Sequence, residues 1–184
     1  MTPDEELAEL RREVRHLKDR QEILDCVMAQ SRGHDRHDLD LMRSVYHDDG
    51  VDEHGPVVAS GPDYGAYANQ AHESVFIDHL HNITTHNCEV DGDTAHAESY
   101  VIGTMRARNG RTVSLIGGRY LDRLERRDGV WRIALRRCTI EWTMNGDTSL
   151  ISSGAFAGFI RGTWDRSDPS YGRPLTLETE VERW

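Results

Sequence analysis

The sequence is poor in several features that would assign a chain to a specialised class of protein. Its three cysteines, Cys26, Cys88 and Cys138, are an odd number without paired spacing, which suits reduced thiols better than a disulfide framework. No apolar run approaches membrane-spanning length. The first residues lack the basic and apolar regions of a signal peptide. These absences favour a soluble protein of the cytoplasm.

Basic charge is also scarce. The chain has 22 Lys and Arg against 32 Asp and Glu, a net charge of −10 with histidine neutral. Nucleic acids and anionic membranes bind basic surfaces, so neither is expected as a partner. The arginines gather among residues with strand character, and we interpret them as the solvated face of a sheet. They are Arg106, Arg108, Arg111, Arg123, Arg126, Arg127, Arg132, Arg136 and Arg137.

The first half of the sequence has the period of amphipathic helices, within a chain of 184 residues that suits a single domain. Apolar residues recur every three or four positions from Leu7 to Met28 and predict a long helix that stops at Gly33. Its first turns resemble a heptad repeat, which fits either a plain surface helix or a contact between subunits. Further helices are predicted over residues 38–46 and 61–76.

Between the second and third predicted helices, the sequence contains a turn signal and a short β-rich stretch. Asp48-Asp49-Gly50 is expected to form the turn, and residues 51–58 a short edge strand. We expect the third helix to bury Tyr64, Tyr67 and Val75 among its apolar residues.

The second half changes to the pattern of antiparallel strands. Three turn signals supply the positive φ angles that hairpins require, namely Asp91-Gly92-Asp93, Asn109-Gly110 and Asp128-Gly129. They separate β-rich segments at about residues 82–90, 94–107, 112–126 and 130–143. Gly117-Gly118 would allow a bulge that bends the sheet. We predict an α+β domain over residues 1–145, in which a cone-shaped, curved antiparallel sheet wraps around three N-terminal helices.

The last part of the chain, residues 146–184, shows neither period clearly. Its glycine, serine and aspartate residues are interspersed with aromatics such as Phe156, Phe159 and Trp164. Because it has too few apolar residues for a core of its own, we interpret it as an ordered tail. Its aromatic side chains are expected to cover the mouth of the cone or a neighbouring subunit.

Several short segments together resemble the SnoaL-like family, which belongs to the nuclear-transport-factor-like α+β cone superfamily. They are Asp19-Arg20-Gln21-Glu22-Ile23, Arg32-Gly33-His34-Asp35, Tyr46-His47-Asp48-Asp49, Asp91-Gly92-Asp93-Thr94-Ala95, Gly117-Gly118-Arg119-Tyr120 and Glu125-Arg126-Arg127-Asp128-Gly129-Val130-Trp131. The resemblance extends over about residues 15–145. It implies the cystatin-like cone fold, which carries enzymes and non-enzymes alike.

Within this family, the sequence is most similar to the scytalone dehydratases, bile-acid dehydratases and hexachlorocyclohexane dehydrochlorinases. These lyases use no metal or organic cofactor, and their catalytic pair falls on Asp35 and His81 of this sequence. A neutral imidazole removes a proton from carbon while hydroxide or halide leaves the adjacent carbon. The carboxylate fixes the imidazole tautomer. The resemblance also implies a small hydrophobic ring compound as substrate and a homotrimer.

Four further residues fall at pocket positions of the family. Tyr46 is a candidate to assist the leaving group, although a tyrosine that caps the core would look the same. His34 stands where the dehydratases have a tyrosine, and Asp52 where the dehydrochlorinase has a tryptophan, so a more polar pocket is expected. Arg136 matches a pocket-side arginine of the dehydrochlorinase, with a surface arginine as the alternative.

Ten histidines also raise the question of a metal site. His79 and His81 would share one face of a strand, and His34 and His37 lie one turn apart on a helix. No cysteine or carboxylate completes either pair at a diagnostic spacing, so no metal ligands are predicted. The sequence therefore predicts a cofactor-independent lyase, either a dehydratase or a dehydrohalogenase. Two alternatives remain: an isomerase or cyclase that uses the same base, and a non-catalytic protein that binds small molecules.

Overall fold

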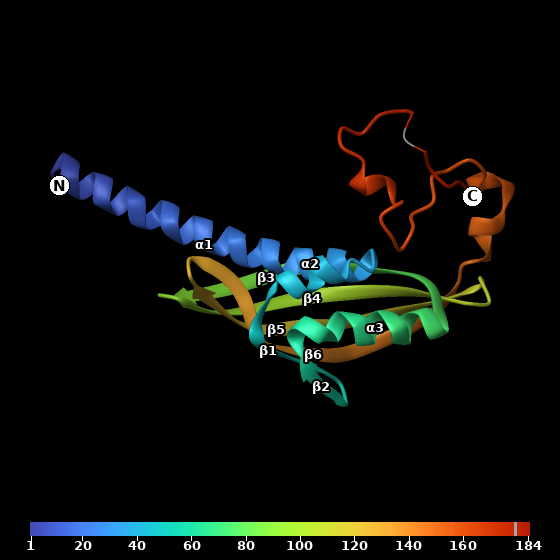
Figure 1. Ribbon diagram of the computed structural model, residues 1–184, viewed down its shortest axis with the longest axis horizontal. Helices are drawn as coiled ribbons and strands as arrows, with labels where there is room; N and C mark the ends of the chain where they lie inside the picture. The colour runs from blue at the N-terminus through green and yellow to red at the C-terminus, as the bar shows by residue number, and fades with distance from the viewer. Residues whose placement is uncertain (179) are drawn as a thin grey trace.

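The computed structural model describes residues 1–178 and 180–184 and has the predicted α+β architecture, with helices followed by a curved sheet (Figure 1). The helices are α1 (Pro3–Asp35), α2 (Leu39–Ser44) and α3 (Gly61–Val75). The strands are β1 (Tyr46–His54), β2 (Val57–Ser60), β3 (Phe76–Asp91), β4 (Thr94–Ala107), β5 (Thr112–Arg127) and β6 (Val130–Asp147). The tail contains the short 3₁₀ helices η1 (Ser149–Ser152), η2 (Gly154–Phe156) and η3 (Pro169–Tyr171).

The six strands form one sheet in the order β2-β1-β6-β5-β4-β3. All neighbouring strands are antiparallel except β1 and β6, which are parallel. The helices lie on one side of this sheet, with α1 against β3 and β6 and α3 against β1 (Figure 1). The three hairpin turns occur where the sequence predicts them, and glycines 92, 110 and 129 have positive φ.

Helix α1 begins at an identifiable capping signal, but it does not end at the glycine that the sequence suggested. Thr2 caps its N-terminus by accepting a hydrogen bond from the backbone N–H of Glu5, whose side chain in turn accepts one from the backbone of Thr2. The helix continues to Asp35, so the predicted stop at Gly33 is wrong. A Cβ at Gly33 would lie 2.7 Å from Cγ of Met42, so this glycine serves the close approach of α2 instead.

The first half of α1 projects beyond the sheet (Figure 1). Its apolar residues Leu7, Leu10, Val14 and Leu17 are all exposed, from 46% for Leu7 to 65% for Leu17. The heptad-like stripe is therefore uncovered in the single chain. None of the helices in the described residues is both long and apolar enough to cross a membrane.

Three local predictions between α2 and β3 need correction. Asp48-Asp49-Gly50 lies inside β1 as an irregularity at which the register with β6 shifts, and β1 is an interior strand rather than an edge. In α3, Tyr67 and Val75 are exposed, because the helix buries mainly the side that contains Tyr64. Strand β3 begins at Phe76, earlier than predicted.

Two bulges shape strand β6. The pairing with β5 shifts between Gly117 and Gly118, as the two glycines predict, and shifts again between Arg123 and Leu124. A Cβ at Gly118 would lie 1.8 Å from the carbonyl oxygen of Thr139. Strands β5 and β6 therefore approach each other so closely at this point that only glycine fits. The second shift inserts Ala134 as an extra residue in β6.

An ion pair lies at the centre of the core. Arg136 is fully buried, and its Nε and Nη2 donate to the two carboxylate oxygens of Asp122 at 2.7 Å each. Its Nη1 donates to Oε1 of Gln30 at 2.8 Å. Arg106 is also buried and pairs with Asp78. The prediction that the arginines lie on a solvated face is therefore wrong for these two.

The tail folds back onto the C-terminal end of α1, where Arg32 donates to Ser170, and onto Asp38 just beyond it (Figure 1). The carboxylate of Asp38 accepts hydrogen bonds from Arg166 at 3.1 Å and from the hydroxyl of Tyr171 at 2.8 Å. These contacts place the ring of Trp164 4.3 Å from that of His37 and 4.8 Å from that of His79, measured between ring centroids. Trp164 thus packs against His37 and His79.

Candidate active site

A cavity of about 240 Å³ lies between the sheet and the helices. Strands β1, β3, β4, β5 and β6 contribute to its wall, together with single residues of α1 and α3. Its lining residues are His34, His54, His72, His81, Val101, Gly103, Met105, Ile116, Gly118, Tyr120, Cys138 and Ile140. A larger groove of about 910 Å³ lies along the projecting half of α1, but its lining includes neither Asp35 nor His81.

The two residues of the predicted pair are in contact, and one of them, His81, lines this cavity. Nδ1 of His81 lies 2.7 Å from Oδ1 of Asp35. The two oxygens of the same carboxylate also accept the backbone N–H of His81, at 3.0 and 2.9 Å. The contact exists because α1 extends to Asp35 and β3 begins early enough to include His81.

The hydrogen bond to Asp35 determines which tautomer the neutral His81 ring adopts. An ionised carboxylate only accepts, so Nδ1 of His81 donates and Nε2 of the neutral ring keeps its lone pair. A Cβ at Gly103 would lie 3.9 Å from Nε2 of His81, and Gly103 lines the cavity. His81 therefore presents an acceptor nitrogen to the cavity, which is what a general base requires.

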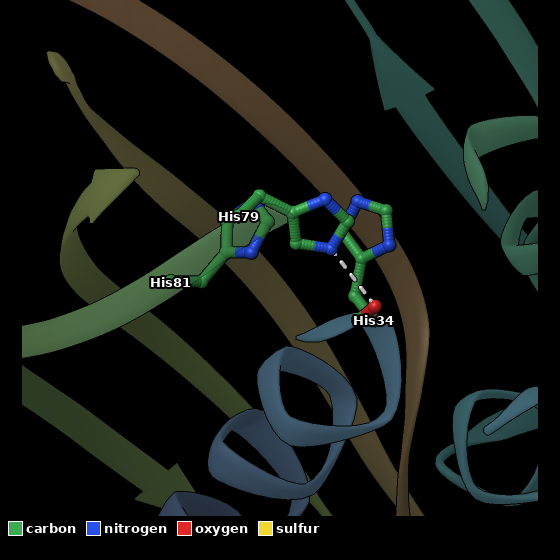
Figure 2. Close-up of side chains that lie close together, drawn as sticks. All are labelled: His34, His79 and His81. Atoms are coloured by element: carbon green, nitrogen blue, oxygen red, sulfur yellow. Dashed lines mark hydrogen bonds between the residues drawn. The ribbon is translucent and has the colours of Figure 1, made fainter. Parts of the chain in front are cut away.

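Further histidines surround His81 (Figure 2). The ring centroid of His34 lies 4.7 Å from that of His81 and 4.6 Å from that of His79. Nε2 of His79 donates to the carbonyl oxygen of His34 at 2.9 Å, the bond drawn in Figure 2. Nδ1 of His34 lies 2.7 Å from Oδ1 of Asn69, and Nδ1 of His72 lies 3.1 Å from Nδ1 of His79.

Burial keeps these surrounding histidines neutral. It lowers the pKa of His34 well below the usual value, and nearby His81 lowers it further. The same causes lower the pKa of His72 to about 4 and that of His79 to about 3. The imidazoles of His34, His72 and His79 are therefore uncharged at neutral pH.

Three other predicted site residues lie behind the cavity wall. The hydroxyl of Tyr46 donates to Oδ2 of Asp52 at 2.5 Å, and Asp52 is fully buried. Arg136 belongs to the central ion pair, and its guanidinium carbon lies 4.1 Å from the ring centroid of Tyr120. None of these three residues is part of the cavity lining. His34, in contrast, is part of the lining.

The sequence analysis missed His54, which lines the cavity. Its Nδ1 lies 3.5 Å from Oδ1 of Asp52. Burial lowers the pKa of His54, but Asp52 and Cys138 outweigh this effect and raise the pKa to about 9. The sequence did contain a signal for His54. It lies two residues after the predicted pocket residue Asp52, and residues two apart on a strand face the same side of the sheet.

The tail was expected to cover the mouth of the cone. In the structure, Trp164 contacts His37 and His79 rather than forming part of the cavity lining. Phe156 and Phe159 contact each other instead, with ring centroids 5.9 Å apart. His37, which the sequence places on a helix, follows the end of α1 and has a φ of 48°.

The fold and the cavity define an α+β cone protein, in which a curved sheet and its covering helices enclose a cavity. The model of the SnoaL-like domain family matches residues 15–137. The chain belongs to that family. Among curated proteins, no sequence is similar enough to count as a relative.

Several solved structures share the fold of this chain. Hexachlorocyclohexane dehydrochlorinase LinA-type3 from Novosphingobium barchaimii has a TM-score of 0.67 and 23% identity, over 73% of this chain and 94% of that chain. A putative scytalone dehydratase from Novosphingobium aromaticivorans has a TM-score of 0.63 and 20% identity, over 70% and 88%. A protein of unknown function from Mycobacterium tuberculosis, solved as a single-residue variant, has a TM-score of 0.60 and 28% identity, over 68% and 77%.

Proposed function

We propose that this protein is a cofactor-independent lyase that removes water from a small hydrophobic ring compound, with His81 as the general base. The observation that supports this proposal is the 2.7 Å hydrogen bond from His81 Nδ1 to Asp35, which leaves Nε2 as an acceptor toward the cavity. The family and the structural similarity to a dehydratase and a dehydrochlorinase support the same class of reaction.

In the proposed reaction, Nε2 of His81 takes a proton from a substrate carbon that lies next to an activating group. The electron pair of the broken C–H bond forms a carbon–carbon double bond as the hydroxyl leaves the adjacent carbon. His54 donates a proton to the departing oxygen, so water is released. Asp35 stabilises the His81 imidazolium that forms, and this support is strong in a site that excludes water.

The charge on His54 favours dehydration over dehydrohalogenation. Hydroxide is a poor leaving group and needs a proton, whereas halide leaves without one. With its pKa raised to about 9, His54 is protonated at neutral pH and lines the same cavity as the base. The presence of Asp52 led us to expect a more polar pocket. The polar side chain that lines the cavity there is His54, two residues further along β1.

The cavity also limits the substrate. Its volume of about 240 Å³ is smaller than the roughly 300–1,000 Å³ of sites for drug-sized ligands. Val101, Met105, Ile116 and Ile140 give it apolar walls. A compound with one or two rings fits these limits better than a steroid.

The leaving group can be tested with two model substrates, scytalone for water loss and hexachlorocyclohexane for chloride release. We expect His54→Leu to slow water loss by about 10²–10⁴-fold, the usual contribution of a general acid, and to change any chloride release by only a few fold. Ultraviolet absorbance of the dehydrated product and a chloride assay measure the two rates. Equal losses in both assays would contradict the role of His54, and wild-type protein that neither converts nor binds either compound would contradict the proposed substrate class.

An isomerase or cyclase is the second candidate, because the same base can abstract an acidic C–H proton without loss of a leaving group. The proton on His54 would then stabilise an enolate oxygen. Mass spectrometry separates the two reactions: a dehydration product is lighter by one water, whereas an isomer has the mass of its substrate.

We further propose a homotrimer in which the outer face of the sheet is covered by neighbouring subunits. This face carries exposed apolar side chains, namely Leu80, Tyr100, Trp142 and Met144, between 41% and 55% exposed. Light scattering is expected to give three times the 21.0 kDa chain mass, and Leu80→Glu to lower it. Tyr67→Glu, at an exposed position of α3 on the other side of the sheet, serves as the control. A monomer mass for the wild type at micromolar concentration contradicts the proposal.

A further inference from the structure

Three histidines beside the cavity each use one ring nitrogen for a hydrogen bond to an oxygen. The oxygens belong to the Asp35 carboxylate for His81, the His34 carbonyl for His79 and the Asn69 amide for His34. All three oxygens accept, so the bonded nitrogens donate. The other nitrogen of each neutral ring therefore has a lone pair: Nε2 of His34, Nδ1 of His79 and Nε2 of His81.

These rings have the spacing of metal ligands. A ligand nitrogen of each of the three lies within 4.8 Å of the others. The ring centroids are 4.6 Å apart for His34 and His79, 4.7 Å for His34 and His81, and 5.3 Å for His79 and His81. A tetrahedral zinc ion with Zn–N bonds of 2.0–2.1 Å holds bound imidazole centroids about 5 Å apart. The centroid spacing of the three rings is therefore close to the spacing that one bound ion requires.

The oxygens that accept hydrogen bonds from the three rings are a second similarity to metal-binding histidines. Metal-binding histidines usually donate their second N–H to a carboxylate or a carbonyl, which fixes the tautomer and orients the ring. The same arrangement holds for all three rings. Asn69 accepts from His34, Asp35 accepts from His81, and the backbone carbonyl of His34 accepts from His79. Ligand imidazoles must also be neutral, and burial of the cluster favours the neutral form.

We propose that His34, His79 and His81 bind one divalent transition-metal ion of the zinc type, and that this ion inhibits the enzyme. Imidazole nitrogen suits zinc, nickel and copper better than the harder calcium and magnesium. The ion replaces the 3.1 Å contact between Nδ1 of His72 and Nδ1 of His79, and the cavity leaves a fourth position for water or for His72. It also occupies the lone pair of His81 Nε2, so the base is lost. Only this inhibition rests on the proposed function; the binding of metal does not.

The binding is tested by titrating chelator-treated protein with Co²⁺, whose visible absorption reports coordination by the protein. We expect saturation at one ion per chain and displacement by Zn²⁺. His79→Gln removes one ligand, and Asn69→Ala removes one supporting oxygen. The Asn69 variant should weaken binding by about 10–100-fold and the ligand variant by more. His96→Ala is the control, because His96 is exposed on β4. Circular dichroism confirms that each variant is folded.

The possible outcomes separate the two parts of the proposal. Equal Co²⁺ affinity of wild-type protein and folded His79→Gln would overturn the metal site, as would a loss of affinity in His96→Ala. If Zn²⁺ binds to this site and turnover stays unchanged, the inhibition is wrong and so is the role of His81 as base. If Zn²⁺ stops turnover and a chelator restores it, both parts are supported. A protein without lyase activity still decides the binding through the Co²⁺ spectrum.

Discussion

Replacement of His81 by alanine should abolish the proposed water loss, because the nitrogen proposed to accept the substrate proton is then missing. Asp35→Asn should lower kcat by roughly 10⁴-fold, the size of the loss when the carboxylate of a histidine pair becomes an amide. The amide N–H of asparagine can donate to Nδ1 of His81, which moves the ring proton to Nε2 and removes the acceptor. Steady-state kinetics on the converted substrate measure both effects, and KM should change little.

A matched control for these variants lies on the same strand. His86 is also in β3, but its Nδ1 lies 2.8 Å from the hydroxyl of Ser99 and it is not part of the cavity lining. His86→Ala should therefore keep the rate within a few fold of the wild type. Retention of more than a tenth of kcat in Asp35→Asn would show that the carboxylate does not set the tautomer. Thermal melts separate this result from simple loss of fold.

Arg136→Met should cost about 3–5 kcal/mol in the free energy of unfolding, because it leaves the Asp122 carboxylate buried without its partner. For a domain of this size, such a loss lowers Tm by roughly 10 °C. Denaturation by urea measures the change. The double variant Arg136→Met/Asp122→Leu should recover much of the stability, because it removes both buried charges.

The neighbouring residue provides the control for this prediction. Arg137 points to the opposite face of β6, is exposed and pairs with Glu53 at the surface. Arg137→Met should therefore change stability by at most about 1 kcal/mol. A similar loss in both variants would mean that the buried ion pair is not the source of the effect, and a double variant less stable than Arg136→Met would contradict the stated reason.

The architecture could be predicted from the sequence because its turns are coded locally. Asn109-Gly110 and Asp128-Gly129 reverse the chain through their own backbone preferences, and Gly110, Asp128 and Gly129 all have positive φ. Gly33 shows the limit of the same argument. A glycine also permits close packing, and only the position of Met42 shows that this, rather than termination of the helix, is its role.

The candidate site was predictable only in part. The proximity of Asp35 and His81 was expected from the family resemblance, and the geometry agrees with it. The surrounding histidines could not be grouped from the sequence, because His34 comes from α1, His72 from α3 and His79 from β3. Their distances depend on how the helices sit on the sheet, which no local pattern reports.

The extra residue at Ala134 has a consequence for comparing this chain with its relatives. Trp131 and Arg136 are both buried on the same side of β6, although their sequence separation is odd. An uninterrupted strand places residues of odd separation on opposite faces, so a buried tryptophan and arginine at this spacing require a bulge between them. A relative with an even separation would need an unbroken strand there. The sequence separation of this tryptophan and arginine, odd or even, is thus a test of whether a family member has the same central ion pair. It can be read from the sequence alone.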